Sequence, residues 1–305
     1  MSLVSIISVN YNQPQVTAEF LDSVAESVST HQIELILVDN GSSEDNGNSF
    51  KHHFPNLKYI RSESNLGFAG GNNLGISKAS GDYILFLNND TELTPYMIDM
   101  LIEEFENNSD IGLLSPLILY HDDKELIQYA GFSDMNYLTA RNRSIGAREQ
   151  DLNQYDKSYE TGFIHGAAMM CRTSDLEHVG LMEENYFLYY EELDWCEKFR
   201  KAGKKIWFTG RAKIYHKESI SVGKDSPLKT YFMHRNRMLF VRKNTSFFNT
   251  FMFSLYYLMI VSPRTILNHY RNDRNDLIPW VFRALAWNIT HSKHSRVLGY
   301  NIAKL

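Results

Sequence analysis

Residues 83–90 read Tyr83-Ile84-Leu85-Phe86-Leu87-Asn88-Asn89-Asp90, an apolar run that ends in three polar side chains. A short run rich in aliphatic residues predicts a buried strand, and the polar triplet marks its end. The same pattern occurs twice earlier, in Leu3–Val9 before Asn10-Tyr11-Asn12 and in Ile33–Val38 before Asp39-Asn40-Gly41-Ser42-Ser43. Segments of helical character separate the three runs, so we expect parallel strands in an α/β sheet.

The polar ends of these strands predict where a ligand binds. In open α/β sheets, ligands bind in the crevice outside the carboxyl ends of the strands. Asn10, Asp39 and Asp90 each follow such an end, so we expect their side chains to face one crevice. This prediction rests on topology alone.

The composition is that of a globular protein. Of its 305 residues, 43% are hydrophobic and 22% are charged, and no internal repeat is present. The two cysteines, Cys171 and Cys196, lack the spacing of a metal site, which indicates a reducing compartment without a disulfide. Because the first predicted strand begins at residue 3, we expect no secretory signal and a cytoplasmic location.

The C-terminal segment differs in charge from the rest of the chain. Residues 235–305 hold 11 Lys and Arg against 2 Asp and Glu, a charge of +9, whereas the remainder carries −14. Its apolar run, Phe247–Val261, has 15 residues and is shorter than the roughly 20 that a membrane-spanning helix needs. We therefore expect helices that lie on an anionic membrane surface. A helical cap on the core, or a contact in a homo-oligomer, is the alternative.

Each polar motif allows a chemical and a purely structural interpretation. Asp90 in Asn88-Asn89-Asp90 could hold a divalent cation, or the triplet could be a turn. Asp39 with Ser42 could bind a nucleoside, or Asp39-Asn40-Gly41 could be a turn. The glycine-rich segment 65–75 could offer backbone amides to phosphate at a helix start, or could allow a tight turn and close packing.

The second half of the chain holds three further candidates. Residues 190–195 place Glu191, Glu192 and Asp194 at a predicted helix start, where a carboxylate could be a general base or could complement the helix dipole. His216 could be a metal ligand or a structural histidine. Arg235 and Arg237 could grip a diphosphate or could form a solvated helix face.

Taken together and in this order, the motifs resemble glycosyltransferase family 2, in its rhamnosyltransferase-like and galactofuranosyltransferase-like branch. The resemblance covers residues 3–240. It implies a GT-A fold, in which a mostly parallel central sheet is flanked by helices. Residues 1–120 would form the nucleotide-binding half and 121–235 the acceptor-binding half of one domain, 1–235. Residues 236–305 would form a basic, aromatic helical tail.

The resemblance also implies a reaction: inverting transfer of a sugar from a nucleotide-diphosphate sugar to a hydroxyl of a glycan or lipid-linked glycan, in cell-surface polysaccharide synthesis. Asp90 and His216 would hold Mn²⁺ or Mg²⁺. Glu192 would be the catalytic base, with Asp194 and Glu191 as substitutes. His165, Gly166 and Ala167 would contact the acceptor. The donor would be bound by Asn10, Asn12, Asp39, Ser42, Asn65, Gly67, Gly71, Asn73, Asn88, Asn89, Arg235 and Arg237.

Two positions depart from the family pattern. Asn88 replaces the first carboxylate of the D-x-D motif, which removes one negative charge from the cation site. Glu192 replaces the usual Asp and is longer by one methylene. A catalytically impaired nucleotide-sugar-binding protein is therefore one alternative. A nucleotidyltransferase, which also uses a crevice, a metal and a nucleotide, is another. No nucleic acid partner is expected, and the sequence leaves dTDP-rhamnose, UDP-galactofuranose and UDP-hexosamines open as donors.

Overall fold

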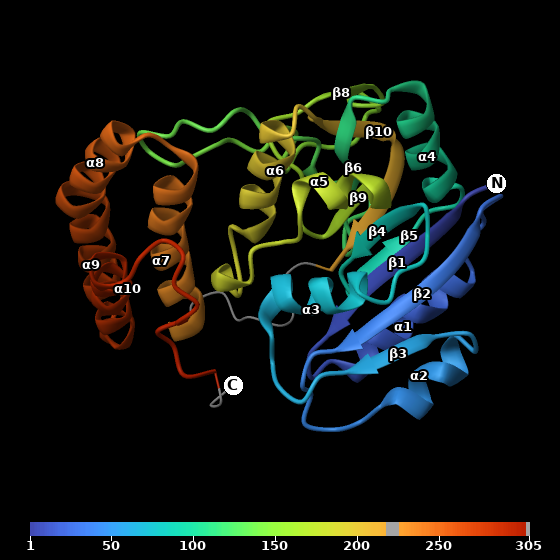
Figure 1. The fold of residues 1–305 in the computed structure, drawn as a ribbon, viewed down its shortest axis with the longest axis horizontal. Coiled ribbons are helices and arrows are strands. Elements are labelled where there is room, and N and C mark those ends of the chain that lie inside the picture. The colour runs from blue at the N-terminus through green and yellow to red at the C-terminus, as the bar shows by residue number, and fades with distance from the viewer. Residues whose placement is uncertain (218–225, 303–305) are drawn as a thin grey trace.

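The computed structural model describes residues 1–217 and 226–302 (Figure 1). One ten-stranded sheet forms its centre, and helices flank the sheet, which confirms the predicted α/β class. The strands are β1 Leu3–Asn10, β2 Gln32–Asp39, β3 Lys58–Arg61, β4 Tyr83–Leu87, β5 Thr91–Leu93, β6 Ile111–Tyr120, β7 Ile127–Tyr129, β8 Ser158–Glu160, β9 Ala168–Arg172 and β10 Lys205–His216.

The α-helices are α1 Pro14–Ala25, α2 Gly47–His53, α3 Gly67–Ile76, α4 Met97–Asn107, α5 Leu176–Val179, α6 Glu191–Lys201, α7 Pro227–Asn244, α8 Phe247–Tyr256, α9 Ser262–Arg271 and α10 Ile278–Thr290. Short 3₁₀ turns are η1 Thr173–Asp175, η2 Glu184–Tyr186 and η4 Asn275–Leu277, and η3 Tyr257–Val261 is a π-helical turn.

The three apolar runs form adjacent parallel strands, as predicted. The sheet order is β3-β2-β1-β4-β9-β6-β10-β5, and β1 runs parallel to both β2 and β4. β9 is antiparallel to β4 and β6, so the parallel character belongs to the first half and the second half is mixed. Side chains on both faces of β1 and β4 are buried, as in Ile6, Ile7, Leu85 and Phe86. Continuous apolar runs are typical of such doubly covered strands.

The C-terminal helices lie at the opposite end of the molecule from β1–β3 (Figure 1). α8, η3 and α9 form one helical run, Phe247–Arg271, and α10 packs against α7. α7 passes through residue 235, the predicted end of the catalytic domain, without a break. The helical run Phe247–Arg271 is longer than the 15-residue apolar run Phe247–Val261 noted in the sequence, because it continues through Pro263.

Candidate active site

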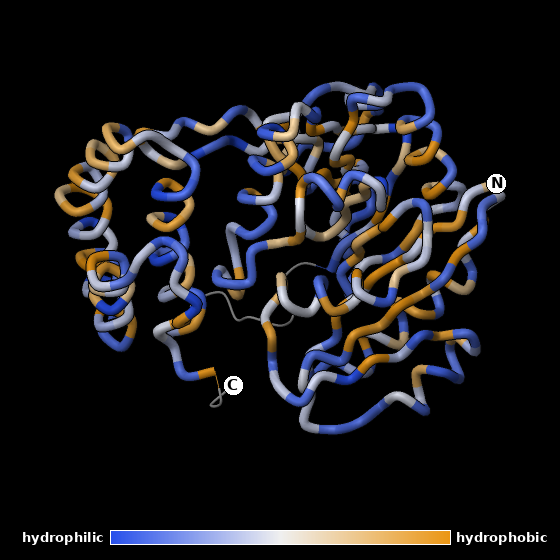
Figure 2. Tube along the Cα trace, viewed as in Figure 1, coloured by the Kyte–Doolittle hydropathy of each residue, from blue (hydrophilic) through white to orange (hydrophobic). Residues whose placement is uncertain are grey.

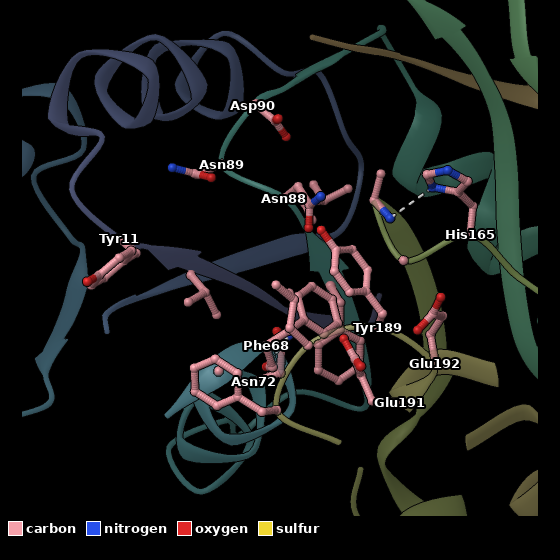
Figure 3. A pocket seen from close by; sticks show the side chains of 18 of the residues that line it. Tyr11, Phe68, Asn72, Asn88, Asn89, Asp90, His165, Tyr189, Glu191 and Glu192 are labelled. Carbon is pink, nitrogen blue, oxygen red and sulfur yellow. Dashed lines mark hydrogen bonds between the residues drawn. The ribbon is translucent and has the colours of Figure 1, made fainter. Parts of the chain in front are cut away.

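A cavity of about 620 Å³ opens at the carboxyl ends of β1 and β4 (Figure 3). Its walls come from the end of β4, the glycine-rich turn before α3, the turn before β9, the start of α6 and the end of β10. Among the predicted site residues, those that line it are Asn65, Gly67, Asn88, Asn89, Asp90, His165, Gly166, Ala167, Glu191, Glu192 and His216.

Asp90 and His216 form a buried pair at one end of the cavity. Nε2 of His216 lies 3.2 Å from Oδ1 of Asp90. Nδ1 of His216 lies 2.8 Å from Oε1 of Gln128, an oxygen that can only accept, so Nδ1 carries a hydrogen and Nε2 is the nitrogen that faces Asp90. Oδ1 of Asp90 is buried and has no hydrogen-bond partner in the structure.

This donor set fits a divalent cation. A carboxylate and an imidazole whose other nitrogen is hydrogen-bonded to an oxygen are a common pair of metal ligands. No group of three His, Cys, Asp or Glu side chains is placed to hold a metal in residues 1–217 and 226–302. The remaining ligands would therefore be substrate oxygens or water, as in open catalytic sites.

Glu191 and Glu192 line the opposite part of the cavity, at the first turn of α6 (Figure 3). Burial raises the pKa of both carboxyls. The pKa of Glu191 is held well above its usual range, and the neighbouring Glu192 contributes to this. A Cβ built on Gly166 would lie 3.9 Å from Cγ of Glu192, so this carboxyl stands beside the turn predicted to contact the acceptor.

Asp194, the predicted substitute base, does not line the cavity. Its Oδ1 accepts hydrogen bonds from Oη of Tyr186 at 3.0 Å and from Nδ2 of Asn244 at 2.7 Å. The side chain is buried and ties α6 to α7 and to the turn before α6. Its role in the structure is to hold these elements together.

His165 lies between the two ends of the site. Its Nδ1 accepts from the backbone N–H of Ala167 at 3.1 Å, which leaves Nε2 as the protonated nitrogen. Its ring stands edge to face with that of His216, 5.9 Å between ring centres. Burial lowers the pKa of His165 to about 3, so the ring is neutral at ordinary pH.

The polar residues at the ends of β1 and β2 lie beneath the cavity. Nδ2 of Asn10 donates to Oδ2 of Asp39 at 2.8 Å and to Oγ of Ser42 at 3.2 Å. The backbone N–H of Asn12 also donates to Oγ of Ser42. The expectation that Asn10 and Asp39 face the crevice is not met, because both side chains are completely buried and bond to each other and to neighbouring residues outside the cavity lining. Their neighbours Tyr11 and Asn40 line the cavity instead.

The residues of the glycine-rich segment 65–75 that are predicted to bind the donor differ in their positions relative to the cavity. Gly67 lines the cavity and has a φ of +74°, and a Cβ there would lie 2.1 Å from the carbonyl oxygen of Phe187. Gly71 packs against Val9, and Nδ2 of Asn73 donates to the carbonyl of Met182 at 2.9 Å. Gly71 and Asn73 therefore serve packing, as the structural interpretation predicted.

Arg235 and Arg237 do not line the cavity and are not on a solvated face. Arg235 is fully buried, with its guanidinium 4.1 Å from the ring centre of Trp287, and it donates to the carbonyl of Asn185 at 2.6 Å. Arg237 donates to the carbonyl of Thr139 at 2.5 Å. Arg235 fits neither predicted interpretation, because it is buried within the protein, and Arg237 is half-buried outside the cavity.

An aromatic wall of the cavity has no counterpart in the predicted site. Phe68, Phe132, Phe187 and Tyr189 contribute to it. The ring of Tyr189 lies at the centre of the cavity in Figure 3, between Asn88 and the two glutamates. Its position two residues before Glu191, the first carboxylate of α6, is the one sequence signal that could have indicated it.

Comparisons with known proteins agree with this geometry. The sequence model of glycosyl transferase family 2 matches residues 5–180. The low-salt glycan biosynthesis hexosyltransferase Agl10 of Haloferax volcanii is 26% identical over 246 residues, which are 77% of this chain and 74% of that protein. The N-acetylglucosaminyl-diphospho-decaprenol L-rhamnosyltransferase of Mycobacterium tuberculosis is 23% identical over 261 residues, 78% of this chain and 84% of that protein.

Two solved structures show the same fold at low sequence identity. GalNAc-T7 with UDP, GalNAc and Mn²⁺ has a TM-score of 0.68 at 16% identity, over 95% of this chain and 58% of that one. The mannosyltransferase PcManGT from Pyrobaculum calidifontis, in complex with GDP-Man and Mn²⁺, has a TM-score of 0.57 at 11% identity, over 95% and 87%. These likenesses confirm the expected GT-A fold.

Proposed function

The chain belongs to glycosyltransferase family 2, and from this we propose that it transfers a sugar from a nucleotide-diphosphate sugar to an acceptor hydroxyl, with inversion at the anomeric carbon. One observation carries the proposal. The Asp90–His216 pair and the carboxyl of Glu192 line opposite parts of one cavity. Such a separation suits a reaction in which the leaving diphosphate and the attacking hydroxyl approach the anomeric carbon from opposite faces.

The donor would lie along the ends of β1 and β4. Tyr11, Asn40 and Asn65 offer an aromatic ring and carboxamides for the nucleoside. Asp90 and His216 would hold Mn²⁺ or Mg²⁺, which when bound neutralises charge on the departing diphosphate. Because Asn88 is uncharged, Asp90 supplies the only carboxylate of this motif, and we expect a modest metal affinity.

Glu192 would act as the general base. Its carboxylate takes the proton from the acceptor hydroxyl, whose oxygen forms the new bond to the anomeric carbon. The bond from that carbon to the diphosphate breaks, and the nucleoside diphosphate leaves with the electron pair. A raised pKa brings Glu192 closer to working pH, where a base is most effective.

The acceptor would enter between the turn at Gly166 and the ring of Tyr189. Aromatic side chains stack well on sugar rings, since the C–H face of a pyranose is apolar. One relative is named as a diphospho-decaprenol rhamnosyltransferase. We therefore propose a glycan or lipid-linked glycan acceptor in cell-surface polysaccharide synthesis, at the cytoplasmic face of a membrane.

The outward face of the C-terminal helices suits this location. The run Phe247–Arg271 is long and apolar enough to cross a membrane by length and composition, and only 22% of its most apolar window is buried. Phe253, Tyr257 and Val261 are buried, whereas Phe247, Phe248, Phe251 and Met259 are 88%, 67%, 51% and 74% exposed. We call these four exposed residues the outer stripe. Figure 2 shows that apolar residues recur along α8 and α9 at this end of the molecule.

The charge of this region favours an anionic lipid surface as the partner. Residues 247–271 contain Arg264, His269 and Arg271 and no Asp or Glu. Exposed phenylalanines beside basic residues are typical of helices that lie in the membrane interface. We propose that the outer stripe rests on the inner leaflet and brings the cavity to a lipid-linked acceptor.

A thermal-shift screen followed by turnover tests the reaction. dTDP-rhamnose, UDP-galactofuranose and UDP-N-acetylglucosamine are each added with Mn²⁺ or with EDTA, since a ligand that binds the native state raises the melting temperature. The donor that gives a shift is then assayed for nucleotide release. Glu192→Gln should keep the shift and lose turnover by roughly 10²–10⁴-fold.

Glu197→Gln is the matched control, because Glu197 is a buried carboxyl on the same helix that bonds Tyr137 and Arg200 outside the cavity. It should keep turnover within a small factor. A donor that binds to the wild type without any turnover would instead support the impaired binding protein, and unchanged turnover in Glu192→Gln would remove Glu192 from its role.

A further inference from the structure

The turn that leads into α6 has an unusual backbone. Phe187 has φ +66° and ψ −56°, and the N–H of Leu188 donates to the carbonyl of Tyr186 at 2.8 Å. This is a γ-turn of the strained kind, with positive φ at its centre. Tyr189 and Tyr190 follow with φ of +71° and +74°. Bulky residues rarely adopt these angles, and such strain persists only where the surroundings over-determine it.

The surroundings here are the side chain of Asn236, on α7. Its Nδ2 lies 2.9 Å from the carbonyl oxygen of Tyr186, 2.8 Å from that of Leu188 and 2.9 Å from that of Tyr189. Asn236 is completely buried. One carboxamide therefore faces three carbonyls of a single turn, and of these the Tyr186 carbonyl also accepts from the N–H of Leu188.

Arg235 fixes the orientation of that carboxamide. Its Nη1 donates to Oδ1 of Asn236 at 2.7 Å, so Oδ1 is the acceptor and Nδ2 must point at the turn. Arg235 itself bonds the carbonyl of Asn185, just before the turn. The fourth carbonyl of the turn, on Phe187, accepts from the backbone N–H of Phe68 at 2.7 Å.

The turn joins two walls of the cavity. Phe68 begins the helix after the glycine-rich turn, on the side expected to bind the donor. Tyr189, Glu191 and Glu192, on the other side of the turn, line the cavity. Any relaxation of the turn would therefore move the ring of Tyr189 and the start of α6 relative to the donor side.

We propose that Asn236 is a positioning residue. Its carboxamide holds residues 186–190 in the backbone conformation described above, with its three positive φ angles, and thereby directs Tyr189 and Glu192 into the cavity. The expected effect of Asn236 on turnover rests on the proposed function. Its expected effect on the conformation of the turn does not, so the structural claim and the functional claim can be tested separately.

The test compares Asn236→Asp with Asn288→Asp. The first change keeps the size of the side chain and replaces donors with acceptors. Asn288 is a matched control, because it is also buried, its Oδ1 accepts from Arg242 and its Nδ2 donates to the carbonyls of Arg235 and Ala284. Those carbonyls belong to α7 and α10, not to the turn. Asn236→Ser, which keeps one donor, replaces the first variant if that one does not fold.

Hydrogen exchange measured on the free protein decides the structural claim. We expect the amides of Phe68 and Leu188, which bond within the turn, to exchange at least tenfold faster in the Asn236 variant than in the wild type. In Asn288→Asp they should stay within twofold of the wild type. Equal protection of these amides in the Asn236 variant would overturn the proposal, whether or not any sugar is transferred.

Turnover decides the functional claim. With whichever of dTDP-rhamnose, UDP-galactofuranose or UDP-N-acetylglucosamine the wild type turns over, donor affinity and the number of binding sites are measured by calorimetry. We expect Asn236→Asp to bind donor normally while kcat per binding site falls at least tenfold, and Asn288→Asp to keep kcat per site. A purely structural role would lower the number of binding sites and leave kcat per site unchanged, and this result would overturn the proposal.

Discussion

Nε2 of His216 lies 3.2 Å from Oδ1 of Asp90, although one residue ends β10 and the other follows β4. The pairing depends on the antiparallel strand β5, which follows Asp90 and lies beside the end of β10, with His216 opposite Thr91. Gln128 orients the imidazole so that Nε2 faces the Asp90 carboxylate. A divalent cation held between these two atoms would be bound by one nitrogen and one carboxylate oxygen.

Replacing either Asp90 or His216 should abolish the metal-dependent part of donor binding. We expect His216→Ala and Asp90→Asn to lose the extra thermal shift that Mn²⁺ gives with nucleotide sugar, and kcat/KM to fall by roughly 10²–10³-fold. The kcat/KM of Gln128→Ala should lie between those of these variants and the wild type, because a residue that orients a metal-binding histidine typically contributes about 10–100-fold to metal affinity or activity. A Mn²⁺-dependent shift that survives in both His216→Ala and Asp90→Asn would place the metal elsewhere.

Stability should depend on Glu191 at high pH. The folded protein holds the pKa of this carboxyl above its unfolded value, since burial disfavours the charge. The stability that this group contributes is therefore complete below the unfolded pKa and is lost as the pH rises through the folded pKa. Glu191→Gln keeps the shape without the charge, so its melting temperature at pH 8 should exceed that of the wild type by roughly 2–4 °C.

The gain should shrink toward zero near pH 4, where Glu191 is protonated in the wild type as well. Differential scanning calorimetry across this range is the measurement. A gain of the same size at both pH values would mean that the carboxyl is not titrating within the folded protein.

Gly166 should control the room available to the acceptor. A methyl group there would lie 3.8 Å from Cζ of Phe68 and 3.9 Å from Cγ of Glu192, which is ordinary contact and leaves the fold intact. We expect Gly166→Ala to raise the acceptor KM several-fold at an unchanged melting temperature and donor affinity. Gly67→Ala provides the contrast: its Cβ would collide with the carbonyl of Phe187, so this variant should lose stability.

The outer stripe should decide membrane binding. We expect the full chain to float with vesicles that contain anionic phosphatidylglycerol, and the triple change Phe247→Ser, Phe248→Ser and Phe251→Ser to reduce the floating fraction at least fivefold. Phe282→Ser is the control, since Phe282 is exposed on α10, outside the stripe. If the wild type does not float with vesicles and is an oligomer, and the triple variant is a monomer, the outer stripe is a contact between copies of the chain.

The sequence predicts the strands well because their signals are local, whereas the pairing of Asp90 with His216 is expected only from the family resemblance. A buried parallel strand reads as an unbroken apolar run, and a polar triplet at its end is visible without knowledge of the neighbours. Whether a polar residue at such an end faces the cavity depends on its partner in the next strand. Asn10 and Asp39 are paired in register, which the sequence of neither strand reveals.

The turn before α6 lies beyond local prediction for a related reason. Phe187, Tyr189 and Tyr190 have side chains that usually avoid positive φ, so their sequence indicates nothing unusual. The turn is stabilised by Asn236, far along the chain, and the same contact explains why the arginine beside it is buried. Tertiary contacts here override every preference that a single segment could show.

The hydrogen bond from the amide of Phe68 to the carbonyl of Phe187 has a kinetic consequence. It links the peptide expected beside the nucleotide to the peptide expected beside the incoming hydroxyl, so a shift of one would be passed to the other. Binding of the sugar nucleotide would then position the residues expected to contact the acceptor. We expect a compulsory order of addition, with the sugar nucleotide first, and product inhibition patterns that reflect this order.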